Sequence, residues 1–196
     1  MKKTIFILSL IIALQTATTA QDGQIEAIKR IYAETNQRIK EAERAFARVK
    51  PKDDAADTDI FLTEVYFNKG KTAYPGSGPF RTETKFYFTL GGGAEKFTGK
   101  PLKIIQTTRD LVEVRLQEWL FNPKGELIFY FEDPDWENTD PEALERRIYF
   151  SGGKVVRFQV GDKTQGNSPL FQNKNEIVQE VLNEQKKLMN VFKNTM

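Results

Sequence analysis

The sequence predicts an α+β fold, in which one amphipathic helix, an antiparallel meander of six or seven strands and a second amphipathic helix follow one another along the chain. Three observations lead to this class. Apolar residues recur every three or four positions near both ends, β-branched and aromatic residues dominate the middle, and short turn clusters divide the middle into segments. No long helical pattern interrupts that middle part, so we expect antiparallel hairpins rather than parallel crossovers.

The first segment, residues 1–20, has the order of a secretory signal peptide. Lys2 and Lys3 precede an apolar run over 5–14, and small residues follow up to Ala20. We expect cleavage after Ala20, which leaves a single domain over 21–196 that is periplasmic or secreted. The apolar run is too short for a stable membrane span, and no other apolar stretch approaches spanning length.

Removal of this segment changes the charge balance. The full chain has 29 basic and 27 acidic residues, and Lys2 and Lys3 leave with the signal, so 29 − 2 = 27 basic residues remain against 27 acidic ones. A net charge of zero gives no general attraction to nucleic acid. We therefore expect an unknown small molecule or an extracytoplasmic protein as the partner, and no nucleic acid.

Cysteine and histidine are both absent from the chain. Their absence excludes a disulfide scaffold, Ser-His-Asp and Cys-His catalytic sites, and zinc bound through histidine. We therefore expect no enzyme, no cofactor and no metal. Glycoside hydrolysis by two carboxyl groups about 5–9.5 Å apart remains a third hypothesis, because that chemistry needs no histidine.

The helix predicted over 24–49 has one apolar seam. This seam suits either packing on the helix's own domain or a coiled-coil dimer, and we favour packing. Its members are Ile25, Ile28, Tyr32, Thr35, Ile39, Ala42, Phe46 and Val49. The helix predicted over 174–193 has a similar seam, and we expect both helices on one face of the sheet. The second seam consists of Ile177, Val178, Val181, Leu182, Leu188, Met189 and Phe192.

The predicted sheet extends over 59–160. Its strand segments are 60–67, 80–90, 102–108, 111–121, 126–132, 146–150 and 154–160. Asp140 and Pro141 have the pattern of a cap and first turn, which predicts a short helix between two of the strands.

Three stretches pair aromatic residues with a glycine-containing turn, and they begin at Tyr66, Phe121 and Tyr149. They resemble MORN-type hairpin repeats in this feature. The resemblance implies hairpins only, because the irregular spacing excludes a tandem array. We expect these stretches to be corners of the sheet, where glycine supplies the positive φ that hairpin turns need.

Two loops suggest phosphate or calcium binding. The glycine-rich segment 91–101 has Pro101 where a phosphate-binding loop needs Ser or Thr, so we expect a hairpin loop. Asp133, Asp135 and Glu137 alternate as calcium ligands do, but Asn138 replaces the usual glycine and Leu144 the last glutamate. We favour a solvated acidic loop, with calcium binding by 133–140 as the open alternative.

The hairpin loops set the faces of the strands. A four-residue loop over 122–125 pairs Leu120 with Leu127. In the next hairpin we prefer a three-residue loop, with Gly153 left-handed, to a two-residue loop, because it keeps the apolar face whole and places Arg147 opposite Arg157. The predicted core face consists of Leu116, Leu120, Leu127, Phe131, Ile148, Phe150, Val156 and Phe158.

The other face supplies the candidate ligand-binding site. Guanidinium groups beside aromatic rings suit an acidic small molecule or a sugar. The predicted exposed patch consists of Arg115, Trp119, Tyr130, Arg147, Tyr149 and Arg157. Neutralisation of the arginines by Glu132 or Glu145 is the structural alternative, which we favour. The expected function is a non-catalytic binding domain, and the alternative is a protein-interaction module, an inhibitor or envelope assembly factor, that acts through loops and a helix.

Overall fold

The computed structural model describes residues 2–49, 56–69, 80–91, 98–110, 113–137, 143–166 and 169–195. Side chains are described within these ranges, except those of 2–20 and of Thr98. The short helix predicted at Asp140 and Pro141 lies outside the described residues. So do most of the glycine-rich loop and the last part of the acidic loop.

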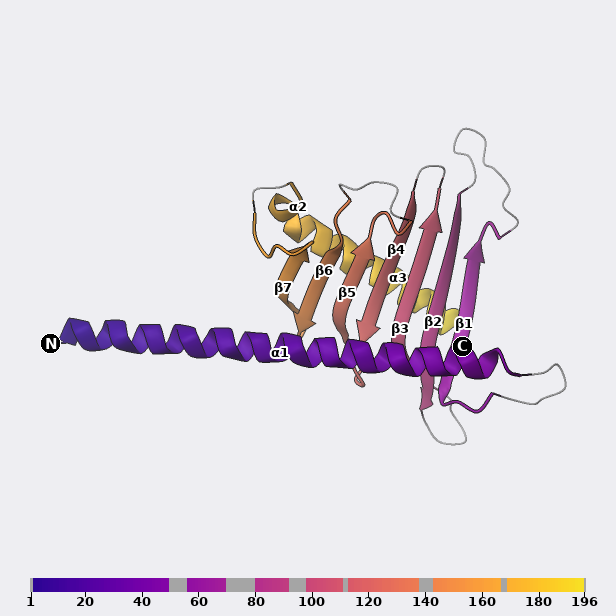
Figure 1. The fold of residues 1–196 in the computed structure, drawn as a ribbon, viewed down its shortest axis with the longest axis horizontal. Coiled ribbons are helices and arrows are strands. Elements are labelled where there is room, and N and C mark those ends of the chain that lie inside the picture. The colour runs from indigo at the N-terminus through magenta and orange to yellow at the C-terminus, as the bar shows by residue number, and fades with distance from the viewer. Residues whose placement is uncertain are drawn as a thin grey trace.

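The seven strands form one antiparallel sheet in the order of the chain, from β1 at one edge to β7 at the other (Figure 1). Both the α+β class and the meander predicted from the sequence are confirmed. The strands are β1 (Ile60–Phe67), β2 (Arg81–Gly91), β3 (Thr98–Arg109), β4 (Val114–Phe121), β5 (Leu127–Asp133), β6 (Arg146–Ser151) and β7 (Lys154–Val160).

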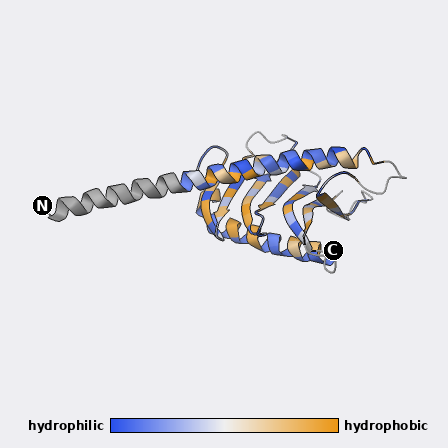
Figure 2. Ribbon diagram, turned by 90° about the horizontal axis from the view of Figure 1, so that it is seen from below, coloured by the Kyte–Doolittle hydropathy of each residue, from blue (hydrophilic) through white to orange (hydrophobic). Residues whose placement is uncertain are grey.

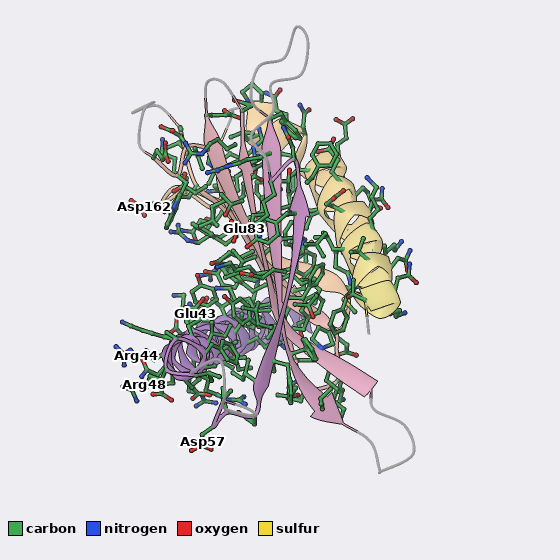
Figure 3. All side chains as sticks on the ribbon, turned by 90° about the vertical axis from the view of Figure 1, so that its right-hand side faces the viewer. Glu43, Arg44, Arg48, Asp57, Glu83 and Asp162 are labelled. Atoms are coloured by element: carbon green, nitrogen blue, oxygen red, sulfur yellow. The ribbon has the colours of Figure 1, made fainter. Side chains whose placement is uncertain are left out.

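Helix α1 (Lys2–Phe46) and helix α3 (Lys174–Thr195) cover opposite faces of this sheet (Figures 1 and 3). The expectation that both helices pack on one face is therefore wrong. A short helix that the sequence reading did not predict, α2 (Pro169–Gln172), precedes α3. The favoured packing of the first helix on its own domain is confirmed, because Ile25, Ile28, Ile39 and Ala42 are buried.

Both faces need a helix because the central strands carry large apolar side chains in both directions. In β4, Trp119 and Phe121 face α3, while Leu120 between them faces α1. In β2, Phe86 faces α3 and Tyr87 faces α1. Figure 2 shows the sheet between the two helices, with hydrophobic residues along most of its strands. Burial on one side only would leave the other apolar side in water.

The core under α3 is one apolar cluster, and it joins residues of β2–β7 to the helix. Its buried members are Phe86, Phe88, Ile104, Trp119, Phe121, Tyr130, Ile148, Phe150, Phe158, Val160, Ile177, Val178, Val181, Leu188 and Phe192. Phe192 packs on two of them, with ring centroids 5.6 Å from Phe86 and 5.2 Å from Phe88.

The core under α1 has two separate clusters with a buried polar group between them. Ile25 and Ile28 belong to one cluster and Ile39 and Ala42 to the other. At the polar group, the Lys103 ammonium lies 2.8 Å from Glu118 Oε1 and donates a 2.6 Å hydrogen bond to Asn36 Oδ1. The Tyr32 hydroxyl donates to Glu118 Oε2 at 2.6 Å. Burial lowers the pKa of Lys103, and the charge of Glu118 opposes that effect.

The hairpin of β4 and β5 differs from the predicted register by a bulge. Leu120 faces Phe129 and Phe121 faces Leu127, so Ile128 is the extra residue. Gly125 has a φ of 79°, and the Asn122 carboxamide accepts hydrogen bonds from the backbone N–H groups of Lys124 and Glu126. The predicted pairing of Leu120 with Leu127 is therefore wrong.

The hairpin of β6 and β7 has a two-residue loop, so the preferred prediction of a three-residue loop is wrong. Ser151 pairs with Lys154, and both intervening glycines, Gly152 and Gly153, have positive φ (54° and 74°). A bulge follows between Tyr149 and Phe150, and it shifts the later pairs.

As a result, Arg147 faces Gln159 and Arg157 faces Tyr149, so the two arginines do not oppose each other. The predicted core face also divides. Leu127, Ile148, Phe150 and Phe158 pack under α3, whereas Leu120, Phe131 and Val156 pack under α1. Leu116 is buried at 8% exposure.

Candidate functional site

A cleft of about 400 Å³ lies between the sheet and α3. This volume is within the range of small-molecule sites, which is roughly 300–1,000 Å³. We call it the α3 cleft. It is lined by Gln106, Arg115, Gln117, Trp119, Tyr130, Glu132, Arg146, Ile177, Glu180, Val181, Asn183, Glu184 and Lys187.

The alternation of side chains along each strand explains why the sheet residues of the cleft all point toward α3. Arg115, Gln117 and Trp119 are two residues apart in β4, so their side chains share the α3 face. Trp119 faces Tyr130 in β5, and the rings lie 5.3 Å apart between centroids. Gln117 faces Glu132, which connects the polar part of the cleft to the same pair of strands.

Hydrogen bonds connect these polar side chains into a chain. Gln117 Nε2 donates to the Tyr130 hydroxyl at 2.8 Å, and that hydroxyl donates to Glu132 Oε2 at 2.8 Å. Arg146 Nη2 donates to Glu132 Oε1 at 2.5 Å, and Arg115 Nε lies 3.6 Å from the same oxygen. Because Gln117, Tyr130, Glu132 and Arg146 are joined by hydrogen bonds, the orientation of these side chains is determined before any ligand binds.

Trp119 and Tyr130 form a buried aromatic layer beneath the cleft, whereas the rim of the cleft is polar. Trp119 and Tyr130 are 0% and 1% exposed. Burial raises the pKa of Tyr130 well above its usual value, and the charge of Glu132 adds to this effect, so the phenol stays protonated. Arg115 is about two-fifths exposed and can contact a ligand from the rim.

The charges of the cleft cancel. Arg115, Arg146 and Lys187 contribute three positive charges, and Glu132, Glu180 and Glu184 contribute three negative ones, so 3 − 3 = 0. Lys187 also pairs with Glu184 at 3.0 Å. This composition favours hydrogen bonding with an uncharged ligand over capture of an anion.

Two buried donors of the cleft, Arg115 Nε and Trp119 Nε1, have no hydrogen-bond partner among the described residues. Trp119 Nε1 is buried, and no acceptor among the described residues lies within hydrogen-bonding distance. A buried donor without a partner costs roughly 1–3 kcal/mol. The unpaired indole N–H of Trp119 therefore lowers the stability of the folded state.

The structure divides the six predicted site residues into two groups of three. Arg115, Trp119 and Tyr130 line the α3 cleft. The other three are on the α1 face, so the prediction of one exposed patch is wrong. The pairing of β5 with β6 causes this outcome, because Tyr130 pairs with Ile148 and the neighbours Arg147 and Tyr149 therefore lie on the opposite face.

The three predicted residues on the α1 face already have partners there. Arg147 pairs with Glu145, which is one of the two neutralising acids expected from the sequence. Arg157 Nη2 lies 2.5 Å from Asp22 Oδ1. Tyr149 is buried against Phe129 at a centroid distance of 4.9 Å. Whether any of the six residues binds a ligand stays a prediction.

Four strand residues of the cleft were absent from the predicted patch, namely Gln106, Gln117, Glu132 and Arg146. Gln106 shares the face of Ile104 because the two are two residues apart in β3, and this alternation was readable. Arg146 faces Glu132 across β5 and β6, and only the correct register identifies that pair. The α3 residues Glu180, Glu184 and Lys187 flank the apolar seam at spacings of three and four, which was also a readable signal.

The acidic loop gives no calcium site within the part that the structure describes. Glu137 pairs with Arg109, and the backbone N–H of Asp135 donates to Asp133 Oδ1 at 3.0 Å. Among the described residues, no group of three acidic side chains is arranged to hold a metal ion. In the same ranges, no helix combines the length and the apolar character needed to cross a membrane.

Comparison with protein-family models, with curated proteins and with solved structures finds no match to this chain. The residues and geometry of the α3 cleft are therefore the basis for inferring function.

Proposed function

We propose that this chain is a non-catalytic binding domain that acts outside the cytoplasm and binds an uncharged polar ligand, such as a sugar, in the α3 cleft. The observation that carries this proposal is the arrangement of the amides of Gln106 and Gln117 and the guanidinium of Arg115 above an aromatic floor of Trp119 and Tyr130. Amide and guanidinium groups match the hydroxyl groups of a sugar. Trp119 and Tyr130 are buried beneath these polar groups and support them from below.

The sequence suggested an acidic small molecule or a sugar as the ligand, and the zero net charge of the α3 cleft favours an uncharged sugar. An acidic ligand would approach Arg115 and Arg146 but would also meet Glu132, Glu180 and Glu184. Like charges in a partly buried site are costly. An uncharged ligand avoids this repulsion and still uses every donor and acceptor on the rim.

The sequence supports the other two parts of the proposal, namely the location outside the cytoplasm and the absence of catalysis. The order of positive, apolar and small residues over 1–20 favours export. The absence of histidine and cysteine removes the usual nucleophile–base pairs and favours binding without chemistry.

The test uses protein recovered from the extracytoplasmic fraction, with its N-terminus read by mass spectrometry. A chain that begins at or near Gln21 is expected. This protein is applied to a glycan array that contains neutral, uronic-acid and sulfated glycans. We expect binding to neutral glycans, and a loss of at least about tenfold in affinity for a Gln117→Ala, Arg115→Ala double variant, since each lost hydrogen bond contributes on the order of tenfold or less.

The matched control is Arg147→Ala, which changes an ion-paired arginine on the opposite face. It should leave glycan binding unchanged. Equal losses for the control and the cleft variant, or binding restricted to sulfated glycans, would contradict the proposed site. Recovery of the uncleaved chain from the cytoplasm alone would contradict the proposed location.

The alternative, an interaction module that acts through loops and a helix, is favoured by one observation. Trp136 and Leu144 are 51% and 50% exposed, and both lie on the connection between β5 and β6. Large exposed apolar residues often mark protein contacts. Absence of glycan binding by the wild-type protein would favour this alternative over the first proposal.

A further inference from the structure

The two edges of the sheet are protected to different degrees. At β7, Lys154 and Arg157 supply charge, a bulge interrupts the strand, and the Gln21 side chain donates a hydrogen bond to the Val156 carbonyl. These features discourage the addition of another strand. At β1, no strand among the described residues pairs with the outer side.

Strand β1 lacks the usual protection of an edge. Its eight residues include no proline and one charged side chain, Glu64, and its pairing with β2 has no bulge. Phe61 and Phe67 are 41% and 50% exposed, and Val191 at the end of α3 is 38% exposed beside them. A long, regular and apolar edge of this kind is a template for another strand.

We propose that the partner at this edge is a second copy of the same chain, which pairs β1 with β1 in an antiparallel ladder about Thr63. A two-fold axis normal to the sheet requires one residue to face its own symmetry mate, because directly opposed residues share a face. The middle of β1 allows Thr63 or Glu64. Glu64 would place two like charges in direct opposition, so Thr63 is favoured.

The Thr63 register is complementary in side chains and in charge. It places Phe61 against Val65 of the second copy, and by symmetry Val65 against Phe61, so that the apolar surface beside the α3 core becomes continuous. It also brings the segment before β1, which contains Asp57, near the segment after β1 of the second copy, which contains Lys69. Two oppositely charged pairs therefore lie at the two ends of the ladder.

A second pair of opposite charges, Arg44 and Arg48 of one copy and Glu83 of the other, supports a second copy as the partner. Figure 3 views the molecule from the β1 edge, and the end of α1 with Arg44 and Arg48 lies on this side. The register places Ile60, which packs under α1, opposite Tyr66 of the second copy. Tyr66 is paired with Glu83 in β2. The end of α1 therefore approaches the region of the second copy that contains Glu83.

The chain has no cysteine, so a single introduced cysteine reports this geometry directly. Thr63→Cys should form a disulfide-linked dimer under mild oxidation, because the two copies of this residue face each other. Glu64→Cys tests the competing register, and Lys154→Cys on β7 is the control edge. Dominant cross-linking at Glu64 would overturn the register, and equal cross-linking at Lys154 would overturn the choice of edge.

Charge exchange tests the same interface without a covalent bond. Asp57→Lys and Lys69→Asp should each weaken dimerisation about tenfold in sedimentation equilibrium, because each converts two attractive pairs into two repulsive ones. A mixture of the two variants should form heterodimers, since both pairs then become attractive. A wild-type protein that stays monomeric at every concentration, or two variants that fail to associate when mixed, would overturn the proposal.

Discussion

The two faces of the sheet hold their helices by different means. Under α3 the core is one continuous apolar cluster, whereas under α1 two smaller apolar clusters lie on either side of a buried ion pair. Apolar burial stabilises without directional preference. A buried ion pair contributes little net stability, but it becomes costly when one partner is displaced. We infer that α3 supplies most of the stability and that the Lys103–Glu118 pair selects the position of α1.

The largest expected effect is on the α3 face. Phe192→Ala should lower the free energy of unfolding by about 3–5 kcal/mol, since the ring is 2% exposed and packs on two other phenylalanines. Phe131→Ala, on the α1 face, should cost about half as much, because Phe131 is only partly buried. Urea denaturation measures both. Equal losses would remove the contrast between the two faces.

The second prediction concerns the ion pair. Lys103→Met leaves Glu118 buried without its cation, so we expect a loss of about 3 kcal/mol. A Lys103→Met, Glu118→Met double variant should recover much of this loss, because no uncompensated charge remains. Urea denaturation of both single variants and the double variant gives the coupling energy. Additive losses would show that the pair is not a coupled unit.

The third prediction is a loss of stability at alkaline pH. Burial raises the pKa of Tyr32, Tyr87 and Tyr130, and nearby glutamates add to the effect. Above pH 10 the unfolded chain releases these phenol protons while the folded chain keeps them. Stability should therefore be complete below pH 10 and fall as the pH rises toward the folded pKa values. Each tyrosine contributes at most about 1.4 kcal/mol per pH unit.

Two of these tyrosines, Tyr32 and Tyr87, lie under α1. The α1 face should therefore contribute more than the α3 face to the loss of stability at alkaline pH. Tyr87→Phe should reduce the slope of unfolding free energy against pH by about 1 kcal/mol per unit. The slope is best measured above pH 10.5, where the lowered pKa of Lys103 no longer contributes. An unchanged slope in Tyr87→Phe would show that this phenol titrates alike in the folded and unfolded chain.

The sequence determined the local elements of this protein. Strands 60–67 and 154–160 agree with the structure, because a period of two residues depends only on near neighbours. Both helical seams agree for the same reason, except that Val49 follows the end of α1 and is 37% exposed. The meander also followed from the sequence, since short turns between strands allow only antiparallel pairing.

Tertiary structure decided the faces and the registers. Residues 127–131 are all apolar, so their pattern is equally compatible with either face and with a bulge at Ile128. The bulges at this position and near Phe150 then determine which arginines are neighbours. The sequence therefore placed Arg115, Trp119 and Tyr130 on one face, but it could not show that Arg146 lines the same cleft while Arg147 and Arg157 lie on the other face. A shift of one residue moves a strand side chain through the sheet, and only packing on both faces selects between the two outcomes.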